Sequence, residues 1–163
     1  LSGALPAIDG SALTGVGKVL QVVNFQTGEY ATGTGTGDGD DTIPQNTELN
    51  EFMTLAITPI SATSKLRIDI VMSWRLAVTS YIIFALFQDT TVDALSAITE
   101  YDTTTGFRHV AFSHNMTSGT TSETTFKLRA GQDRAGTTYF NGSGGRRLGG
   151  VMASGITITE YEV

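Results

Sequence analysis

The chain has 163 residues, of which 40% are hydrophobic and only 16% charged, and its formal net charge at pH 7 is −6. This length is typical of one domain with its own core, and the acidic balance argues against nonspecific binding to nucleic acid. The absence of cysteine excludes disulfides and thiolate chemistry. The longest apolar run, YIIFALF from Tyr81, is too short to cross a bilayer, so we expect no membrane insertion.

Residues 1–17, LSGALPAIDGSALTGVG, are predicted to be extended, because Pro6 and the glycines interrupt any helical period. The chain begins at Leu1 without an initiator methionine or a signal-like segment, so we interpret it as part of a longer protein. We expect residues 1–17 to be a stalk or linker and residues 18–163 to form a β-sandwich domain.

From residue 18 onward the apolar residues follow the alternating period of β-strands, and no segment has a convincing helical period. Few charges and many threonine and glycine residues also favour strands with polar outer faces. Short polar turns separate the predicted strands, which cover residues 18–26, 52–58, 65–72, 81–88, 107–115, 123–130, 137–141 and 155–161. The pattern predicts an all-β fold, an antiparallel β-sandwich of jelly-roll type.

Residues 33–44, GTGTGDGDDTIP, combine glycines with three aspartates, Asp38, Asp40 and Asp41. The segment lacks the lysine of a phosphate-binding loop. It comes close to a calcium-binding nonapeptide, but such repeats bind calcium by stacking on neighbouring copies, and here there is one copy. We therefore expect a mobile connection and keep a calcium site at the three aspartates as the alternative.

The strands predicted at 65–72 and 81–88 differ in their faces. In the first strand apolar residues alternate with charged ones, so one face is buried and the other is solvated. In the second strand both faces are apolar, and one of them carries Ile83, Ala85 and Phe87. Because a two-layer sandwich covers only one face of each sheet, we expect these three residues to contact a partner subunit.

Residues that could carry catalysis are scarce. The sequence has no nucleophile elbow, HExxH motif or dinucleotide-binding glycine pattern. His109 and His114 lie five positions apart on a predicted strand, so they point to opposite faces and cannot share one metal site. One acidic region contains Asp89, Asp93, Glu100 and Asp102. Two of these carboxylates could form a glycosidase-type pair, but the simpler interpretation is that they are solvated residues of a loop. We expect neither an enzyme nor a cofactor.

Three stretches have the order and spacing of a known family: LPAIDGSALTGVGKVLQVV, DDTIPQNTELNEFMTLAITPISATSKLRIDIVMSW and GGRRLGGVMASGITITEYEV. They resemble the entry, the core and the C-terminal end of the C-terminal domain of bacteriophage tail fibres and related virion attachment proteins. The resemblance is poorest over residues 89–145. It implies a homotrimeric, β-structured tip at the distal end of a fibre, carried by the virion and exposed for host recognition. The partner-facing residues Ile83, Ala85 and Phe87 would then form the trimer interface.

The resemblance further implies a non-enzymatic module that binds a bacterial surface receptor, a glycan or a protein, through exposed loops, with the rest of the fibre preceding Leu1. Trp74 and Tyr101 are candidates because an aromatic face can stack on a sugar ring. The other candidate receptor-binding residues are Asp93, Asp102, His114, Asn115 and Tyr139. Two alternatives stay open: a structural domain that only trimerises or caps the fibre, and a glycan depolymerase that uses the carboxylates of residues 89–102.

Overall fold

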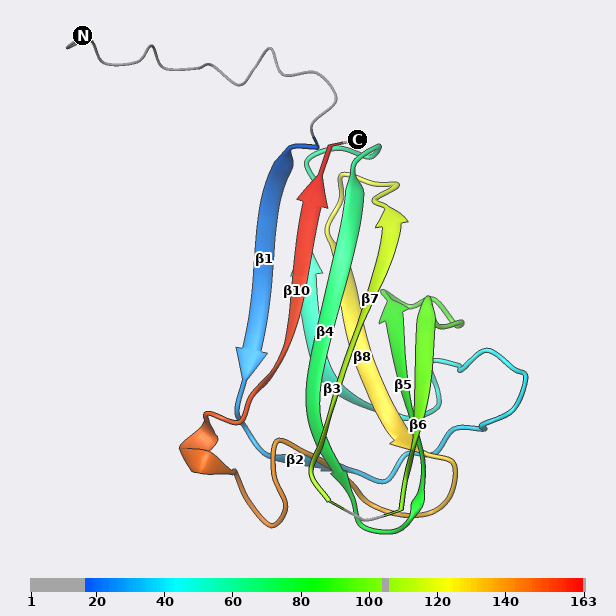
Figure 1. Ribbon diagram of the computed structural model, residues 1–163. Coiled ribbons are helices and arrows are strands. Elements are labelled where there is room, and N and C mark those ends of the chain that lie inside the picture. Colours follow the sequence, from blue (N-terminus) through cyan, green and yellow to red (C-terminus); the bar gives the residue numbers. More distant parts are fainter. Residues whose placement is uncertain (1–16, 104–105, 163) are drawn as a thin grey trace, which may run out of the picture.

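The computed structural model describes residues 17–103 and 106–162, which form two antiparallel β-sheets packed face to face (Figure 1). This arrangement confirms the predicted all-β sandwich. The predicted stalk lies outside the described residues except for Gly17. Within the described chain the helical structure is the single 3-10 turn η2 (Leu148–Gly150), and no helix there is long and apolar enough to span a membrane.

One sheet has six strands. Its order is β1 (Val19–Thr27), β10 (Ser154–Tyr161), β4 (Lys65–Leu76), β9 (Thr138–Phe140) and β2 (Ala31–Gly33), and β7 (Arg108–Thr117) also pairs with β4. The other sheet has four strands, in the order β3 (Asn50–Ile57), β8 (Thr124–Gln132), β5 (Ser80–Gln88) and β6 (Ser96–Asp102). We call them the six-stranded sheet and the four-stranded sheet.

All the predicted strands are present, with ends that differ by a few residues. The largest difference is at β4, which continues to Leu76 because Trp74 and Leu76 stay in the buried register. The sequence pattern does not reveal β2, which has only three residues. It also misses β6, where the crowding of acidic residues favoured a loop.

The core lies between the sheets and is built from alternate residues of the strands. The inward residues predicted for β4 are at most 1% exposed: Leu66, Ile68, Ile70 and Met72. The largest buried rings come from both sheets: Trp74, Phe84, Phe126 and Phe140. Burial of each such apolar side chain favours folding by about 1.5–3 kcal/mol.

The outer face of β5 is covered by the same chain. Ile83, Ala85 and Phe87 are at most 4% exposed, and they pack with Leu49 and Ala94 in a second, smaller apolar cluster. We expected these three residues to contact a partner subunit because a two-layer sandwich would leave them exposed, but they are already buried within one chain. The face that needed a cover has one within the chain, in residues 34–49, which we call the cover segment.

The cover segment lies directly on the sheet. A Cβ atom added at Gly131 of β8 would collide with the carbonyl oxygen of Gly35, so the two backbones can approach only because residue 131 is glycine. The amide of Gly37 donates to the carbonyl of Gln132 at 3.1 Å. We expected a mobile connection over residues 33–44; the structure shows its first part bound to β8 at Thr36 and Gly37, while residues 38–43 are exposed.

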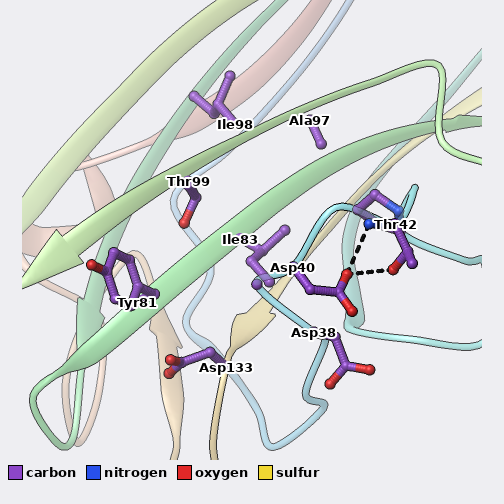
Figure 2. Close-up of a pocket in the computed structure, with 11 residues that line it drawn as sticks. Asp38, Asp40, Thr42, Tyr81, Ile83, Ala97, Ile98, Thr99 and Asp133 are labelled. Atoms are coloured by element: carbon purple, nitrogen blue, oxygen red, sulfur yellow. Dashed lines mark hydrogen bonds between the residues drawn. The ribbon is translucent and has the colours of Figure 1, made fainter.

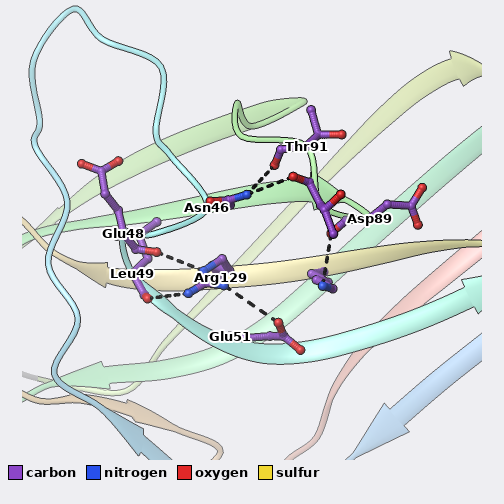
Figure 3. A network of polar contacts seen from close by, with 9 residues as sticks. Asn46, Glu48, Leu49, Glu51, Asp89, Thr91 and Arg129 are labelled. Carbon is purple, nitrogen blue, oxygen red and sulfur yellow. Dashed lines mark hydrogen bonds and ion pairs between the residues drawn. The ribbon is translucent and has the colours of Figure 1, made fainter.

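Arg129 of β8 holds the end of the cover segment (Figure 3). Its guanidinium group donates to the carbonyl oxygens of Glu48 at 3.0 Å and of Leu49 at 3.2 Å. On the other side, the side-chain amide of Asn46 donates to the carbonyls of residues 90 and 91 at 3.2 and 3.0 Å. The segment is therefore tied both to β8 and to the turn that follows β5.

A buried carboxylate joins β10 to the connection between β3 and β4. The side chain of Glu160 is 0% exposed. It accepts hydrogen bonds from the amides of Ile60 and Ser61 at 2.9–3.1 Å, and from the side chains of Ser64 and Gln21 at 2.6 Å each. Burial by itself would raise the pKa of this carboxyl, but the hydrogen bonds outweigh burial and lower the pKa below 4.5.

The two described ends of the chain lie side by side at one end of the sandwich (Figure 1). There the amide of Glu162 donates to the carbonyl of Lys18 at 2.9 Å. The connections β4–β5, β8–β9 and β9–β10 lie at the opposite end. We call that opposite end the distal end.

Replacing Glu160 with glutamine should lower the free energy of unfolding at pH 7 by about 2–3 kcal/mol. The NH2 group of glutamine is a hydrogen-bond donor, and it would face the backbone amides and side chains that donate to the carboxylate. The lowered pKa means that the carboxylate stabilises the fold fully above the unfolded-state pKa near 4.5, and that this contribution is lost as the pH falls through the folded-state pKa. The stability gap between wild type and Glu160→Gln should therefore narrow on acidification. Urea denaturation from pH 7 downward measures it. Glu162→Gln, at an exposed position, is the matched control, and equal losses in both variants would contradict this role.

Leu49→Ala should destabilise the protein by about 2 kcal/mol and loosen the cover segment, because it removes the apolar contact with β5. Hydrogen exchange at the amide of Gly37, which is bonded to the Gln132 carbonyl, should accelerate. Ile43→Ala is the control, since that side chain is 55% exposed. Unchanged exchange at Gly37 in Leu49→Ala would show that this packing does not hold the segment.

Candidate functional site

A groove of about 650 Å³ opens between the cover segment and the β5–β6 hairpin, on the outer face of the four-stranded sheet (Figure 2). Ile83 of β5 and Ala97 and Thr99 of β6 form its floor, and residues 38–44 of the cover segment form a wall. The floor residues share a face because Ile83 pairs with Thr99 across the two strands. We call this hollow the acidic groove.

Two tyrosines stand at one end of the acidic groove. Tyr81 lines it, and Tyr101 lies directly opposite Tyr81 in the β5–β6 register. Their ring centroids are 4.6 Å apart, and the residues are 46% and 52% exposed. The pair is near the distal end, because β5 begins there and β6 ends there (Figure 1). It offers an aromatic surface to a ligand that lies along the groove.

The wall of the groove is negatively charged. Asp38 and Asp40 line it, and its lining residues include no lysine or arginine. The hydroxyl and the amide of Thr42 donate to Asp40 at 2.6 and 2.8 Å, and these bonds lower the pKa of Asp40 below 3.8. This carboxylate is therefore ionised at neutral pH and faces the groove as an acceptor of hydrogen bonds.

A third carboxylate, Asp133, lies at the end of the groove next to Tyr81 (Figure 2). The hydroxyl of Ser80 donates to it, and Arg134 lies 3.3 Å away. The Ser80 hydrogen bond is the main reason that the pKa of Asp133 is lowered below 3.8, and Arg134 adds to the effect. Asp133 therefore extends the negative charge of the wall toward the tyrosine pair.

The acidic segment does not assemble a metal site. Among the residues that the structure describes, no three histidine, aspartate or glutamate side chains come together in a way that could hold a metal ion. Asp38, Asp40 and Asp41 are near in sequence, but one oxygen of Asp40 is engaged by Thr42. The arrangement gives no support to the calcium alternative.

Two predicted receptor-binding residues are buried. Trp74 is 1% exposed and packs in the core with its ring 5.6 Å from that of Phe84. Asp102 is 0% exposed, with an oxygen 3.3 Å from the guanidinium of Arg108. Neither side chain can reach a receptor in this structure, because each is on the inward face near the end of its strand.

The other predicted residues are scattered over the surface. Tyr139 is half-buried on β9, where its ring stacks with Tyr30 at 6.4 Å. On β7, Asn115 is exposed, while His114 is half-buried on the inward side, and that burial lowers its pKa below 6.5. Only Tyr101 lies beside the acidic groove. His109, the other histidine, is on the outward side of β7, as predicted from the spacing, and its Nδ1 contacts the Ser73 hydroxyl at 2.9 Å.

The carboxylates considered for catalysis serve separate local contacts. Asp89 accepts hydrogen bonds from the Thr124 hydroxyl at 2.8 Å and the Thr125 amide at 2.7 Å. Asp93 accepts one from the side chain of Gln45 at 2.7 Å. These bonds fasten the turn after β5 to β8 and to the cover segment, so both carboxylates have structural roles there.

Sequence reasoning missed Tyr81, Thr99 and Asp133. Tyr81 is on the same face of β5 as Ile83, and the apolar character of both faces hid the fact that this face opens at its distal end. Thr99 is on β6, which was not predicted as a strand. The signal that could have found the site is the pairing of two tyrosines across a hairpin, but that requires the β5–β6 register.

No protein-family model matches the chain, and no curated protein matches it. Three similar solved structures are a CBM4 structure (TM-score 0.43, 18% identity, 68% of this chain and 66% of that one), infectious bursal disease virus Gx strain (0.41, 14%, 88% and 37%) and the enzymatically active domain of tailspike protein 4 of bacteriophage CBA120 (0.30, 14%, 76% and 19%). The chain thus spans only part of each of them. These neighbours include a viral and a phage protein, and likenesses of this size indicate no function.

Proposed function

We propose that this chain is a non-enzymatic attachment module of a phage virion, the tip of a tail fibre, and that it binds a bacterial surface glycan in the acidic groove. The observation that carries the proposal is an open groove lined at one end by the exposed ring of Tyr81, which contacts the exposed ring of Tyr101. The resemblance of the sequence to tail-fibre C-terminal domains supplies the virion context. Residues before β1 would continue into the rest of the fibre.

The chemistry of the groove suits a sugar chain. A pyranose can lay its C–H face on Tyr81 or Tyr101, while its hydroxyl groups donate to Asp38 and Asp40. The hydroxyl of Thr99 on the floor donates to the Ile82 carbonyl at 2.9 Å, so it can accept a hydrogen bond from a sugar hydroxyl. The ionised carboxylates would repel acidic sugars, so neutral or amino sugars are the favoured class.

A trimer would strengthen this binding. Each chain contributes one acidic groove near the distal end, and three weak sites that face the same cell surface bind with far higher avidity than one. The homotrimer is part of the proposal. Because the outer face of β5 is covered by its own chain, the trimer contacts would come from other surfaces.

Tyr81→Ala and Tyr101→Ala should each weaken binding of the single site by about three- to tenfold, the range expected from losing one aromatic contact. Binding to host cells and competition with phage adsorption measure the effect, and thermal melting checks the fold. Tyr161→Ala, on the six-stranded sheet, is the matched control.

Unaltered binding in both groove variants would exclude the groove as the receptor site. A wild-type module that neither binds cells nor competes with adsorption would favour the purely structural role. Release of reducing ends from purified host polysaccharide would instead identify a glycan depolymerase.

The proposed trimer predicts a mass in solution of about three times the 17.3 kDa of one chain. Light scattering coupled to size-exclusion chromatography measures it. A mass near that of one chain across the accessible concentrations would contradict the trimer while leaving the groove proposal open to its own test.

A further inference from the structure

A second charged surface lies at the distal end, away from the acidic groove. Arg147, in the connection between β9 and β10, contacts Phe107, which directly precedes β7. The sequence neighbours of these two residues, Arg146, Arg108 and His109, are included with them. We call these five residues the arginine surface. Two of its three arginines have an acidic partner, Asp102 or Glu29, so the charge that would attract a negatively charged partner is chiefly that of Arg147.

Arg147 rests on an aromatic platform. Its guanidinium carbon is 5.1 Å from the centroid of the Phe107 ring, and Phe107 is 38% exposed. Stacking restricts the flat guanidinium group while its N–H edge stays available to a ligand. Within the part of the chain that the structure describes, no carboxylate lies within ion-pair distance of Arg147.

The neighbouring arginines already have acidic partners. Arg108 lies 3.3 Å from the buried Asp102, which fixes the start of β7. Arg146 lies 3.1 Å from Glu29, and both of those side chains are more than half exposed. An exposed ion pair contributes little and opens readily, so Arg146 can add its charge to that of Arg147 when an anion arrives.

The backbone of the β9–β10 connection holds Arg147 at the surface. The amide of Gly150 donates to the Arg147 carbonyl at 2.8 Å, and the amide of Ser143 donates to the Gly145 carbonyl at 3.1 Å. The φ angles of Gly145 and Gly150 are 144° and 94°, which only glycine adopts without strain. Leu148, next to Arg147, is 76% exposed, so the turn projects outward.

We propose that Arg147, supported by Phe107, binds an anionic group, a phosphate or a carboxylate carried by a surface glycan. The planar guanidinium group can donate two parallel hydrogen bonds to either group. The site goes beyond the groove, because the groove repels anions and a neutral sugar needs no arginine. The module therefore presents two surfaces of opposite charge at its distal end.

NMR titration of the full chain tests the proposal. The arginine Nε–H signals and the backbone amides of residues 107–109 and 144–150 are followed as sodium phosphate or sodium acetate is added, with sodium chloride at equal ionic strength as the reference. We expect saturable shifts centred on Arg147. Arg147→Gln should weaken the affinity at least tenfold. Arg147→Lys should lose part of the affinity, because lysine cannot donate the two parallel hydrogen bonds of a guanidinium group. Phe107→Ala should weaken the affinity about threefold.

Arg67→Gln is the matched control, because Arg67 is an exposed arginine on β4 with its own partner, Asp69, at 2.9 Å. Shifts as large in chloride as in phosphate, or affinities equal in wild type and Arg147→Gln, would overturn the proposal. A second titration with a polyglycerol phosphate and a polyuronate distinguishes the two sources of the anion. Tighter binding of a thymidine oligonucleotide than of both polymers would overturn the glycan as the partner.

Discussion

The buried carboxylate of Glu160 is the contact on which the packing depends at the end of the sandwich where the two chain ends meet. A charge can be buried in a sandwich only where hydrogen bonds replace the water that it loses. Glu160 finds those donors on β1, through Gln21, and on the β3–β4 connection. This one side chain of β10 therefore joins β1 to the β3–β4 connection.

The cover segment explains how a two-layer fold can contain a strand that is apolar on both faces. The inference that the second face of β5 must be covered was correct, and the cover was misidentified. A segment built from glycine and aspartate carries almost no apolar signal, since Leu49 supplies its main contact with the cluster. Its fit depends on backbone approaching backbone at Gly35 and Gly131. The same close packing creates the wall of the groove.

Positions within strictly alternating strands could be predicted, and positions near strand ends could not. Leu66 and Ile68 could be predicted to lie inside, because the charged residues that alternate with them, Lys65 and Arg67, must face solvent. Trp74, just beyond the predicted end of its strand, was a candidate to contact a sugar, and it lies inside because β4 continues to Leu76. Tyr81 and Tyr101 meet only through the pairing of two strands, one of which was hidden by its acidic residues. A binding site assembled from such pairings is not visible in local periodicity.

The side-by-side position of Lys18 and Glu162 would have a mechanical consequence if the chain is the attachment module that we propose. In that case, a pull through the start of β1 with the distal end bound to a cell would act along the axis of β1. That strand is joined to β10 by antiparallel pairs from Val19 to Thr27, so the load is applied in shear and the hydrogen bonds share it instead of opening one after another. Forced unfolding is governed by the unfolding rate and not by equilibrium stability. The geometry therefore suits a domain that must stay folded while it transmits tension.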